Sequence, residues 1–243
     1  MNSSLFEAMS INDCQLSPNR IDIWQFPLTH APCAMEAILN EEELTRAKRF
    51  YFPKHQRRFA VARMMLRFIL SRYLPIAPEA INFSYNHYGK PSVANDQQLE
   101  FNISHSDELA ILAIGQNSPL GIDVEFFSAR PYQGIAKHLF SNQEQEQLAQ
   151  LPNYFKPLAF FTIWSQKEAF IKTCGLGLSY PTEQFSVKAL TSGQENVFDP
   201  LHHHYLQLVS FMPTIGCCAA LCCDLNITSI HKLTLTDNTL ILA

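Results

Sequence analysis

The sequence lacks several features that mark particular classes of protein. None of its apolar runs reaches the roughly 18 residues that a membrane-spanning helix requires. Residues 1–17 are polar and acidic, without the basic and then apolar segments of a secretion signal. The 14 prolines and 8 glycines are scattered and form no linker-like tract. We therefore expect a cytoplasmic globular protein without membrane contacts.

Paired cysteines and familiar phosphate motifs are also missing. The seven cysteines are odd in number, and four of them crowd into residues 217–223, which favours reduced thiols buried in a strand over a disulfide framework. Because two separated Cys-x₂-Cys pairs are absent, the cysteines do not predict zinc. The tract His202–His204 looks like a metal-binding tract, but it follows Pro200 in a polar loop, which disfavours a ligand role. No P-loop occurs in the chain.

Charge is sparse and unevenly distributed. Charged residues make up 16% of the chain and apolar residues 47%, which leaves ample material for a core. Nine of the 18 basic residues lie between Arg46 and Arg72, a segment with no acid. Such a run is either a solvated helix face or an electropositive patch for an anionic ligand or acidic partner. No aromatic-rich binding motif accompanies it, so we predict no nucleic-acid partner.

The elements predicted from the sequence recur in two halves. In the first half, Asn40 is typical of a helix N-cap and Pro53 of a first helical position. In the second half, Ser141 and Glu144 form a capping box, and Gly175 fits a helix C-terminus. The predicted helices span residues 40–50, 53–74, 131–139 and 154–174, and a further helix begins at Ser141. The predicted strands span residues 21–26, 81–85, 100–103, 109–115, 122–126, 184–188, 205–211 and 216–223.

A weak internal repeat joins the two halves. Residues 20–26 align with residues 121–127 at an offset of 101 (121 − 20), and Phe59 then matches Phe160. The repeat predicts an α+β fold of two similar lobes, each with a small antiparallel sheet and a long helix, and an active-site cleft between them. The expected boundaries are an extension at 1–19, an N-terminal lobe at 20–119 and a C-terminal lobe at 120–243.

Two carboxylates lie on one face of the strand that opens the second half. Alternate side chains of a strand share a face, so Asp123 and Glu125 point the same way, while Ile122 and Val124 point into the core. Adjacent carboxylates together with substrate phosphate suit Mg²⁺. Solvent-facing acids would give the same pattern, so the pair alone does not establish a site.

An acid and a base lie one turn apart on the last long helix. Glu168 and Lys172 are four residues apart, which places them on one helix face. A surface ion pair is the simple interpretation. However, Phe160, Trp164 and Phe170 indicate a mostly buried helix, where charges need a partner or a metal.

The segment Asn102–Ser106, with the sequence Asn-Ile-Ser-His-Ser, offers two interpretations. A Ser–His nucleophilic pair is one. Adjacent residues in an extended chain point to opposite sides, however, so Ser104 is poorly placed for activation by His105. The hydroxyls, the imidazole and the backbone N–H groups are instead suited to binding a phosphate.

Four motifs together resemble those of the 4′-phosphopantetheinyl transferase superfamily, in its two-lobed monomeric type. The most specific are the strand Gly121–Glu125 and the helix Trp164–Lys172, which follow the family's Gly-(Ile/Val)-Asp-(Ile/Val)-Glu and Trp-x-x-Lys-Glu-(Ala/Ser)-x-x-Lys patterns. The turn Gly89–Pro91 and the segment Asn102–Ser106 precede them in the family's order. The similarity extends over about Arg46–Phe185.

The resemblance implies an enzyme that transfers the phosphopantetheine arm of coenzyme A to a serine of an acyl, polyketide or peptidyl carrier protein. Adenosine 3′,5′-bisphosphate is the other product. By the same resemblance, Asp123, Glu125 and Glu168 hold Mg²⁺, and Glu168 also serves as the base for the carrier serine. Lys172 stabilises the leaving phosphate or donates its proton.

The resemblance further implies a set of coenzyme A contacts. Ser104 and His105 match residues that contact the 3′-phosphate, and Lys90 lines the same pocket. Arg46 and Arg58 match positions that bind phosphates of coenzyme A. At Glu43 the chain departs from the pattern, because the family often has a basic residue there. Two alternatives use the same scaffold: a non-catalytic coenzyme A or nucleotide-binding module, and a metal-dependent phosphohydrolase.

Overall fold

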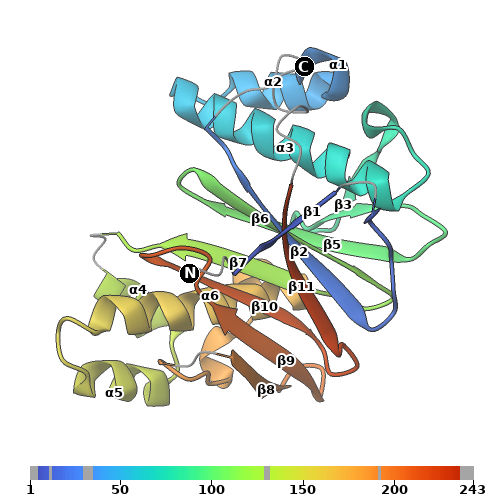
Figure 1. The fold of residues 1–243 in the computed structure, drawn as a ribbon. Coiled ribbons are helices and arrows are strands. Elements are labelled where there is room, and N and C mark those ends of the chain that lie inside the picture. The colour runs from blue at the N-terminus through green and yellow to red at the C-terminus, as the bar shows by residue number, and fades with distance from the viewer. Residues whose placement is uncertain (1–4, 11–12, 30–34, 129–131, 191–192, 236–243) are drawn as a thin grey trace.

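The structure is a computed structural model that describes all residues except 1–4, 11–12, 30–34, 129–131, 191–192 and 236–243. It is an α+β fold built around two sheets, each covered by one long helix (Figure 1). No helix among the described residues is long and apolar enough to cross a membrane.

The first sheet has five strands in the order β1-β11-β2-β6-β5. They are β1 (Glu7–Met9), β11 (Ser229–Leu235), β2 (Arg20–Pro27), β6 (Leu109–Gln116) and β5 (Leu99–Ser106). Around it lie α1 (Met35–Ile38), α2 (Glu41–Lys48), the long α3 (Pro53–Tyr73), the 3₁₀ turn η2 (Pro78–Ala80) and the hairpin of β3 (Phe83–Tyr85) and β4 (Pro91–Val93).

The second sheet has four antiparallel strands in the order β7-β10-β9-β8. They are β7 (Gly121–Phe126), β10 (Cys217–Asp224), β9 (His204–Phe211) and β8 (Gly193–Asp199). Its helices are α4 (Tyr132–Leu139), α5 (Asn142–Gln150) and the long α6 (Lys156–Cys174), and its 3₁₀ turns are η3 (Gly177–Ser179) and η4 (Thr182–Gln184). The two lobes therefore repeat the same plan, as the offset repeat predicted.

Three hydrophobic layers hold the lobes together. One lies between α3 and the first sheet, and a second lies between α6 and the second sheet. The third lies between the two sheets, where Ile21 and Ile111 of the first meet Ile122 and Val124 of the second. The four cysteines of β10 are buried, as predicted. The sheets thus pack face to face, which brings β5 and β7 side by side.

The predicted helix ends are confirmed. The Asn40 side chain accepts the backbone N–H of Glu43, and the Glu43 carboxylate accepts the N–H of Asn40. Ser141 and Glu144 make the same reciprocal pair. Gly175 ends α6 in the left-handed region, with φ of 73°, where glycine carries no steric cost.

Two sequence expectations need correction. The last strand, β11, does not join the C-terminal lobe: it runs parallel to β2 in the first sheet and bridges it to β1, so that sheet is not purely antiparallel. Residues 184–188 do not form a strand. There the N–H of Val187 donates to the Glu144 side chain, which replaces pairing with another strand. The outer strand of the second sheet is β8, which the sequence did not predict.

Candidate active site

The carboxylates of Asp123 and Glu125 project from β7 toward α6. Ile122 and Val124, on the opposite face of the strand, are buried in the layer between the sheets. Asp123 is 4% exposed, and its carboxylate meets the end of α6. The indole N–H of Trp164 donates to Glu125 Oε1 at 3.3 Å. The predicted alternation is therefore confirmed, and neither acid is a simple surface charge.

Lys172 reaches across from α6 to β7. Its Nζ lies 2.6 Å from Asp123 Oδ1 and 3.2 Å from the carbonyl oxygen of Ile122, and it also donates to Ser104 Oγ at 3.1 Å. The sequence placed Glu168 and Lys172 on one helix face, and the structure adds Asp123 as the direct partner of the ammonium. One lysine thus links both lobes at this point.

The electrostatics of the site suit a divalent cation. Burial raises the pKa of Glu168 to about 7; Lys172 opposes this shift, and the charges of Asp123 and Glu125 reinforce it. Asp123 Oδ2 is buried without a hydrogen-bond partner among the described residues. Buried polar atoms normally have partners, so an orphaned carboxylate oxygen indicates an absent ligand. Carboxylate oxygens are the donors that Mg²⁺ prefers, so the side-chain chemistry of Asp123, Glu125 and Glu168 suits such an ion.

Strand β5 joins the site through alternate side chains. Ser104 Oγ donates to Asp123 Oδ1 at 2.8 Å, and Ser106 Oγ donates to Glu125 Oε2 at 3.0 Å. Between the strands, the side chain of Asn102 accepts the backbone N–H of Ile122 at 2.8 Å. Ser106 and Asn102 were not assigned roles from sequence, although the period of two in a strand places them on the same face as Ser104.

His105 lies on the other face of β5, among positive charges. Loss of hydration around the ring, and then the charges of Lys172 and Arg58, lower its pKa, so the imidazole is neutral at neutral pH. Arg58 is held by the turn after β5, where it pairs with Asp107 and, at 2.8 Å, with Glu108.

The predicted basic segment is only partly an open patch. Arg57 and Arg58 share Glu108, and Arg67, which is fully buried, pairs with Glu43 at 2.8 Å. Glu43 is thus a buried residue that also caps α2, which explains why position 43 carries an acid. Arg46 is exposed at the end of α2, and its guanidinium lies 5.3 Å from the centre of the Phe59 ring.

Lys90 lies at the contact between the turn 86–91 and the end of α6. Its Nζ donates to the carbonyl oxygen of Leu120 at 3.0 Å and to that of Thr173 at 3.4 Å. Burial lowers the pKa of this lysine. In the same turn, the side chain of Asn86 donates to the Gly175 carbonyl at 2.7 Å. Lys90 and Lys172 therefore both bond to carbonyls at the start of β7.

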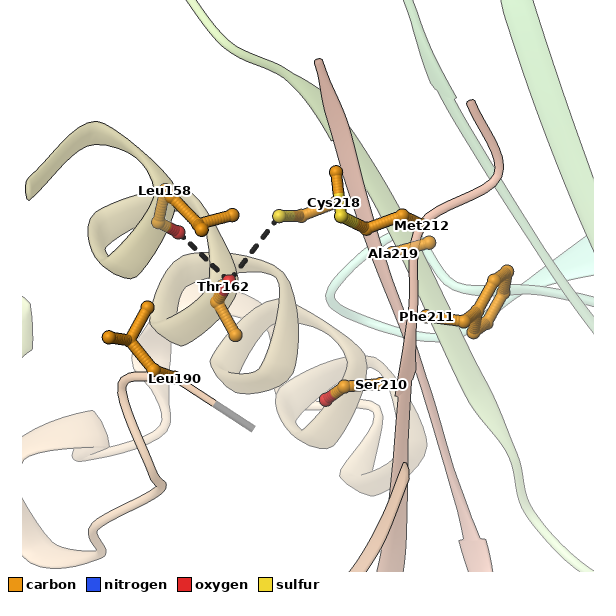
Figure 2. Close-up of a pocket in the computed structure, with 8 residues that line it drawn as sticks. All are labelled: Leu158, Thr162, Leu190, Ser210, Phe211, Met212, Cys218 and Ala219. Atoms are coloured by element: carbon orange, nitrogen blue, oxygen red, sulfur yellow. Dashed lines mark hydrogen bonds between the residues drawn. The ribbon is translucent and has the colours of Figure 1, made fainter. Parts of the chain in front are cut away.

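An apolar cavity lies on the α6 side of the second sheet (Figure 2). It measures about 230 Å³ and is lined by Leu158, Thr162, Leu190, Ser210, Phe211, Met212, Cys218 and Ala219. Thr162 Oγ1 contacts Cys218 Sγ at 3.3 Å, and Cys218 is the strand partner of Glu125 across β7 and β10. Its lining holds no carboxylate or basic group.

Comparisons with known proteins agree with this geometry. A family model described as "4'-phosphopantetheinyl transferase superfamily" matches residues 119–213, and one described as "4'-phosphopantetheinyl transferase, N-terminal" matches residues 23–117. The chain is 38% identical to "4'-phosphopantetheinyl transferase HetI" of Nostoc over 68% of this chain and 72% of the relative. It is 32% identical to "4'-phosphopantetheinyl transferase Sfp" of Bacillus subtilis over 76% of this chain and 82% of the relative.

Proposed function

The chain belongs to the 4′-phosphopantetheinyl transferase superfamily and is an enzyme of that class, and on this premise we propose the reaction that its site performs. The 4′-phosphopantetheine group of coenzyme A passes to a serine hydroxyl of an apo carrier protein. The reaction requires Mg²⁺ and releases adenosine 3′,5′-bisphosphate.

One observation supports this proposal most directly: a buried carboxylate oxygen of Asp123 has no hydrogen-bond partner among the described residues. Burial raises the pKa of Glu168, and Asp123 and Glu125 lie close enough for their negative charges to add to this effect. Three carboxylates against the single ammonium of Lys172 leave an excess of negative charge, which Mg²⁺ would balance. We propose Asp123, Glu125 and Glu168 as its ligands.

In the transfer, the carrier serine loses its proton, and its oxygen attacks the phosphorus next to the pantetheine arm. The bond from that phosphorus to the bridging oxygen breaks, and the electron pair leaves with the adenosine 3′,5′-bisphosphate. Bound Mg²⁺ would polarise the pyrophosphate and neutralise developing charge. We propose Glu168 as the acceptor of the serine proton, directly or through water, because its carboxylate faces the same site as Asp123 and Glu125.

Lys172 has a second task in this scheme. Its ammonium contacts Asp123 and Ser104 before the substrate arrives. We propose that it turns toward the leaving phosphate, where a fixed cation stabilises the charge that develops in the transition state. The site contains no convincing nucleophile, and direct transfer to the carrier serine requires none.

The remaining phosphates of coenzyme A need a binding surface in the N-terminal lobe. Ser104 offers a hydroxyl, and His105 offers a neutral imidazole beside the guanidinium of Arg58. We propose His105 and Arg58, on one face of β5, for the 3′-phosphate, and Ser104, on the opposite face, as a contact for another phosphate of coenzyme A. Lys90 and Arg46 are proposed as further contacts, Lys90 after exchanging its present carbonyl partners for phosphate oxygens.

A carrier protein is the proposed second substrate, and the enzyme is proposed to act as a monomer because both lobes lie in one chain. Lys48, Arg49 and Lys54 are exposed around the junction of α2 and α3. These side chains offer positive charge to an acidic partner, an interaction that mainly speeds association and weakens with salt. Light scattering on the purified enzyme, alone and with its carrier, tests the monomer.

The test is to incubate the enzyme with coenzyme A, Mg²⁺ and a panel of apo carrier proteins from fatty-acid, polyketide and peptide synthesis, and to weigh each carrier by mass spectrometry. At least one carrier should gain the mass of phosphopantetheine. Glu168→Gln and Lys172→Met should abolish the gain. The matched controls Glu146→Gln and Lys137→Met, both at exposed helix positions, should leave it unchanged.

Other outcomes would support the alternatives. Normal coenzyme A binding without any modified carrier would favour a non-catalytic binding module. Release of phosphopantetheine into water in the absence of a carrier would favour a phosphohydrolase. Full activity of Glu168→Gln, or of the wild type in the presence of a chelator, would contradict the metal assignment.

A further inference from the structure

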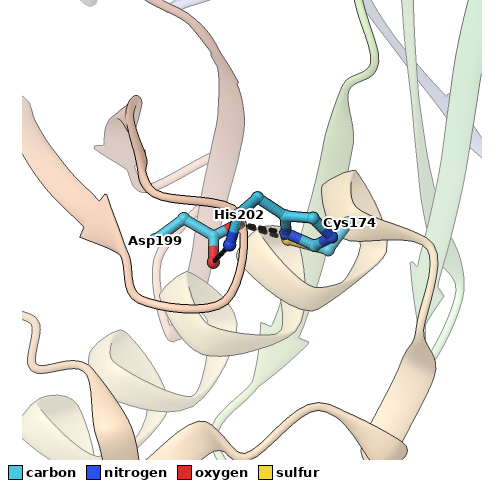
Figure 3. Close-up of side chains that lie close together, drawn as sticks. All are labelled: Cys174, Asp199 and His202. Atoms are coloured by element: carbon cyan, nitrogen blue, oxygen red, sulfur yellow. Dashed lines mark hydrogen bonds and ion pairs between the residues drawn. The ribbon is translucent and has the colours of Figure 1, made fainter.

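A cysteine, an aspartate and a histidine meet at the end of α6 (Figure 3). Cys174 is the last residue of α6, Asp199 is the last residue of β8, and His202 lies in the turn that follows. Asp199 Oδ2 lies 3.4 Å from Cys174 Sγ and 2.7 Å from His202 Nδ1. The three candidate ligand atoms all lie within 4.8 Å of one another.

The aspartate is held in a fixed orientation. It is fully buried, and its other oxygen, Oδ1, accepts the Tyr180 hydroxyl at 2.6 Å and the backbone N–H groups of Leu201 and His202. Burial alone would raise its pKa, but the hydrogen bonds from Tyr180 and His202 outweigh this and lower the pKa to about 2. Asp199 is therefore an ionised carboxylate with one oxygen directed at a thiol and an imidazole.

The cluster borders a cavity of about 190 Å³. Cys174, Asp199 and His202 line it together with His204 and Asp224. This volume accommodates an ion with a water molecule, and His204 is a nearby candidate for a fourth ligand. The three-residue cluster therefore has both converging ligand atoms and open space beside them.

We propose that Cys174, Asp199 and His202 form a second metal site that takes Zn²⁺. Zinc accepts sulfur and imidazole ligands, whereas magnesium does not favour them. The metal preference of this cluster therefore differs from that of the carboxylates of β7. A thiolate and a carboxylate balance the two charges of zinc, so the buried site becomes neutral. Water or His204 completes the usual four ligands.

Binding is coupled to a proton. Burial and the charge of Asp199 raise the pKa of Cys174, so the metal-free residue is a thiol. When the Zn–S bond forms, the S–H bond breaks and its proton leaves to solvent. His202 coordinates through the lone pair of Nδ1, with its hydrogen on Nε2. One proton should therefore be released per zinc ion bound.

The position of the cluster predicts a structural effect of the metal. Cys174 follows Thr173, whose carbonyl accepts Lys90 from the other lobe, and it lies two residues after Lys172. An ion shared by the end of α6 and the β8–β9 turn would hold that helix end in place. We expect zinc to raise the melting temperature of the protein.

The experiment is calorimetric titration of the full chain with Zn²⁺ in excess Mg²⁺, using the Glu168→Gln background to weaken zinc binding at the β7 carboxylates. One equivalent should bind and release one proton, measured in buffers of different ionisation enthalpy. Cys174→Ser and His202→Ala should each lower the affinity more than tenfold. The matched controls Cys14→Ser and His203→Ala should leave it unchanged.

Tyr180→Phe protects the test against misfolding of the direct variants, because it changes no proposed ligand and removes one of the three hydrogen bonds that orient Asp199. Loss of such an outer partner should lower the zinc affinity by roughly 10- to 100-fold. A variant counts in this test only if its circular dichroism spectrum matches that of the parent protein. Absence of a bound equivalent in the Glu168→Gln protein, or equal affinity in the His202→Ala and His203→Ala variants, would overturn the proposal.

Discussion

Gly121 opens β7 at the point where the backbone of α6 lies directly against it. A Cβ added there would lie 2.1 Å from the Ala169 carbonyl oxygen, 2.5 Å from the Thr173 backbone nitrogen and 2.7 Å from Thr173 Oγ1. Two of these three atoms belong to the helix backbone, which has no alternative rotamer. Gly121→Ala must therefore move the helix or the strand.

The size of the movement follows from the contact. Ordinary van der Waals contact begins at 3.4 Å and the Ala169 oxygen would be at 2.1 Å, so the two must separate by about 1.3 Å. Such overpacking typically costs about 1–3 kcal/mol of stability. The same shift carries Glu168 and Lys172 away from Asp123, and a displacement of about 1 Å in a catalytic group can lower the rate about 100-fold.

The assay compares kcat/KM for carrier modification and the melting temperature in Gly121→Ala and Gly134→Ala. Gly134 lies in α4, where an added Cβ meets nothing within 4 Å. We expect Gly121→Ala to lose about two orders of magnitude in kcat/KM and to melt earlier, and Gly134→Ala to keep full activity. A Gly121→Ala enzyme with normal kcat/KM and normal melting would refute the packing argument.

Three further predictions concern buried polar groups. Burial raises the pKa of Glu168 from 4.5 to about 7, so the metal-free fold loses stability as pH rises through this range. At about 1.4 kcal/mol per pKa unit, Glu168→Gln should raise the free energy of unfolding, measured in chelator, by up to about 3 kcal/mol near pH 8. Near pH 4.5 the same substitution should change it by almost nothing. Glu144→Gln should cost about 3–5 kcal/mol in urea unfolding, because it leaves the Lys167 ammonium buried without a carboxylate; a cost below about 1 kcal/mol would contradict this. Asn102→Ala should cost about 1–3 kcal/mol and speed amide exchange at Ile122, whose N–H loses its acceptor; unchanged exchange would argue against that bond.

The site was predictable where local periodicity decides the geometry. A strand period of two placed Asp123 and Glu125 together, and a helical turn placed Glu168 beside Lys172. The structure confirms both faces. The cap at Gly175 was equally local, since glycine tolerates the left-handed backbone that ends α6. These features depend on neighbours within a few residues, which a single sequence contains.

The long-range contacts were not predictable in the same way. The pairing of β11 with β2 joins residues about 200 positions apart, and no local pattern specifies that register. Similarly, Ser106 enters the site only because β5 lies beside β7. A ligand role for His202 was disfavoured because it lies in a polar loop, and its partner Cys174 is distant in the sequence. Tertiary packing determines all three.

The duplicated halves show why only one of them carries the chemistry. Asp22 of β2 occupies the position that repeats as Asp123, but its two oxygens accept Tyr73 and Arg20, each at 2.6 Å. Trp24 completes that cluster by donating to the Tyr73 hydroxyl at 2.8 Å. Every oxygen of the first aspartate is therefore satisfied by protein, whereas one oxygen of Asp123 is not. Because the strand and its facing helix are common to both halves, this difference arises from side chains alone. The first half has a closed hydrogen-bond network that stabilises the fold, and the second retains a carboxylate oxygen for a ligand.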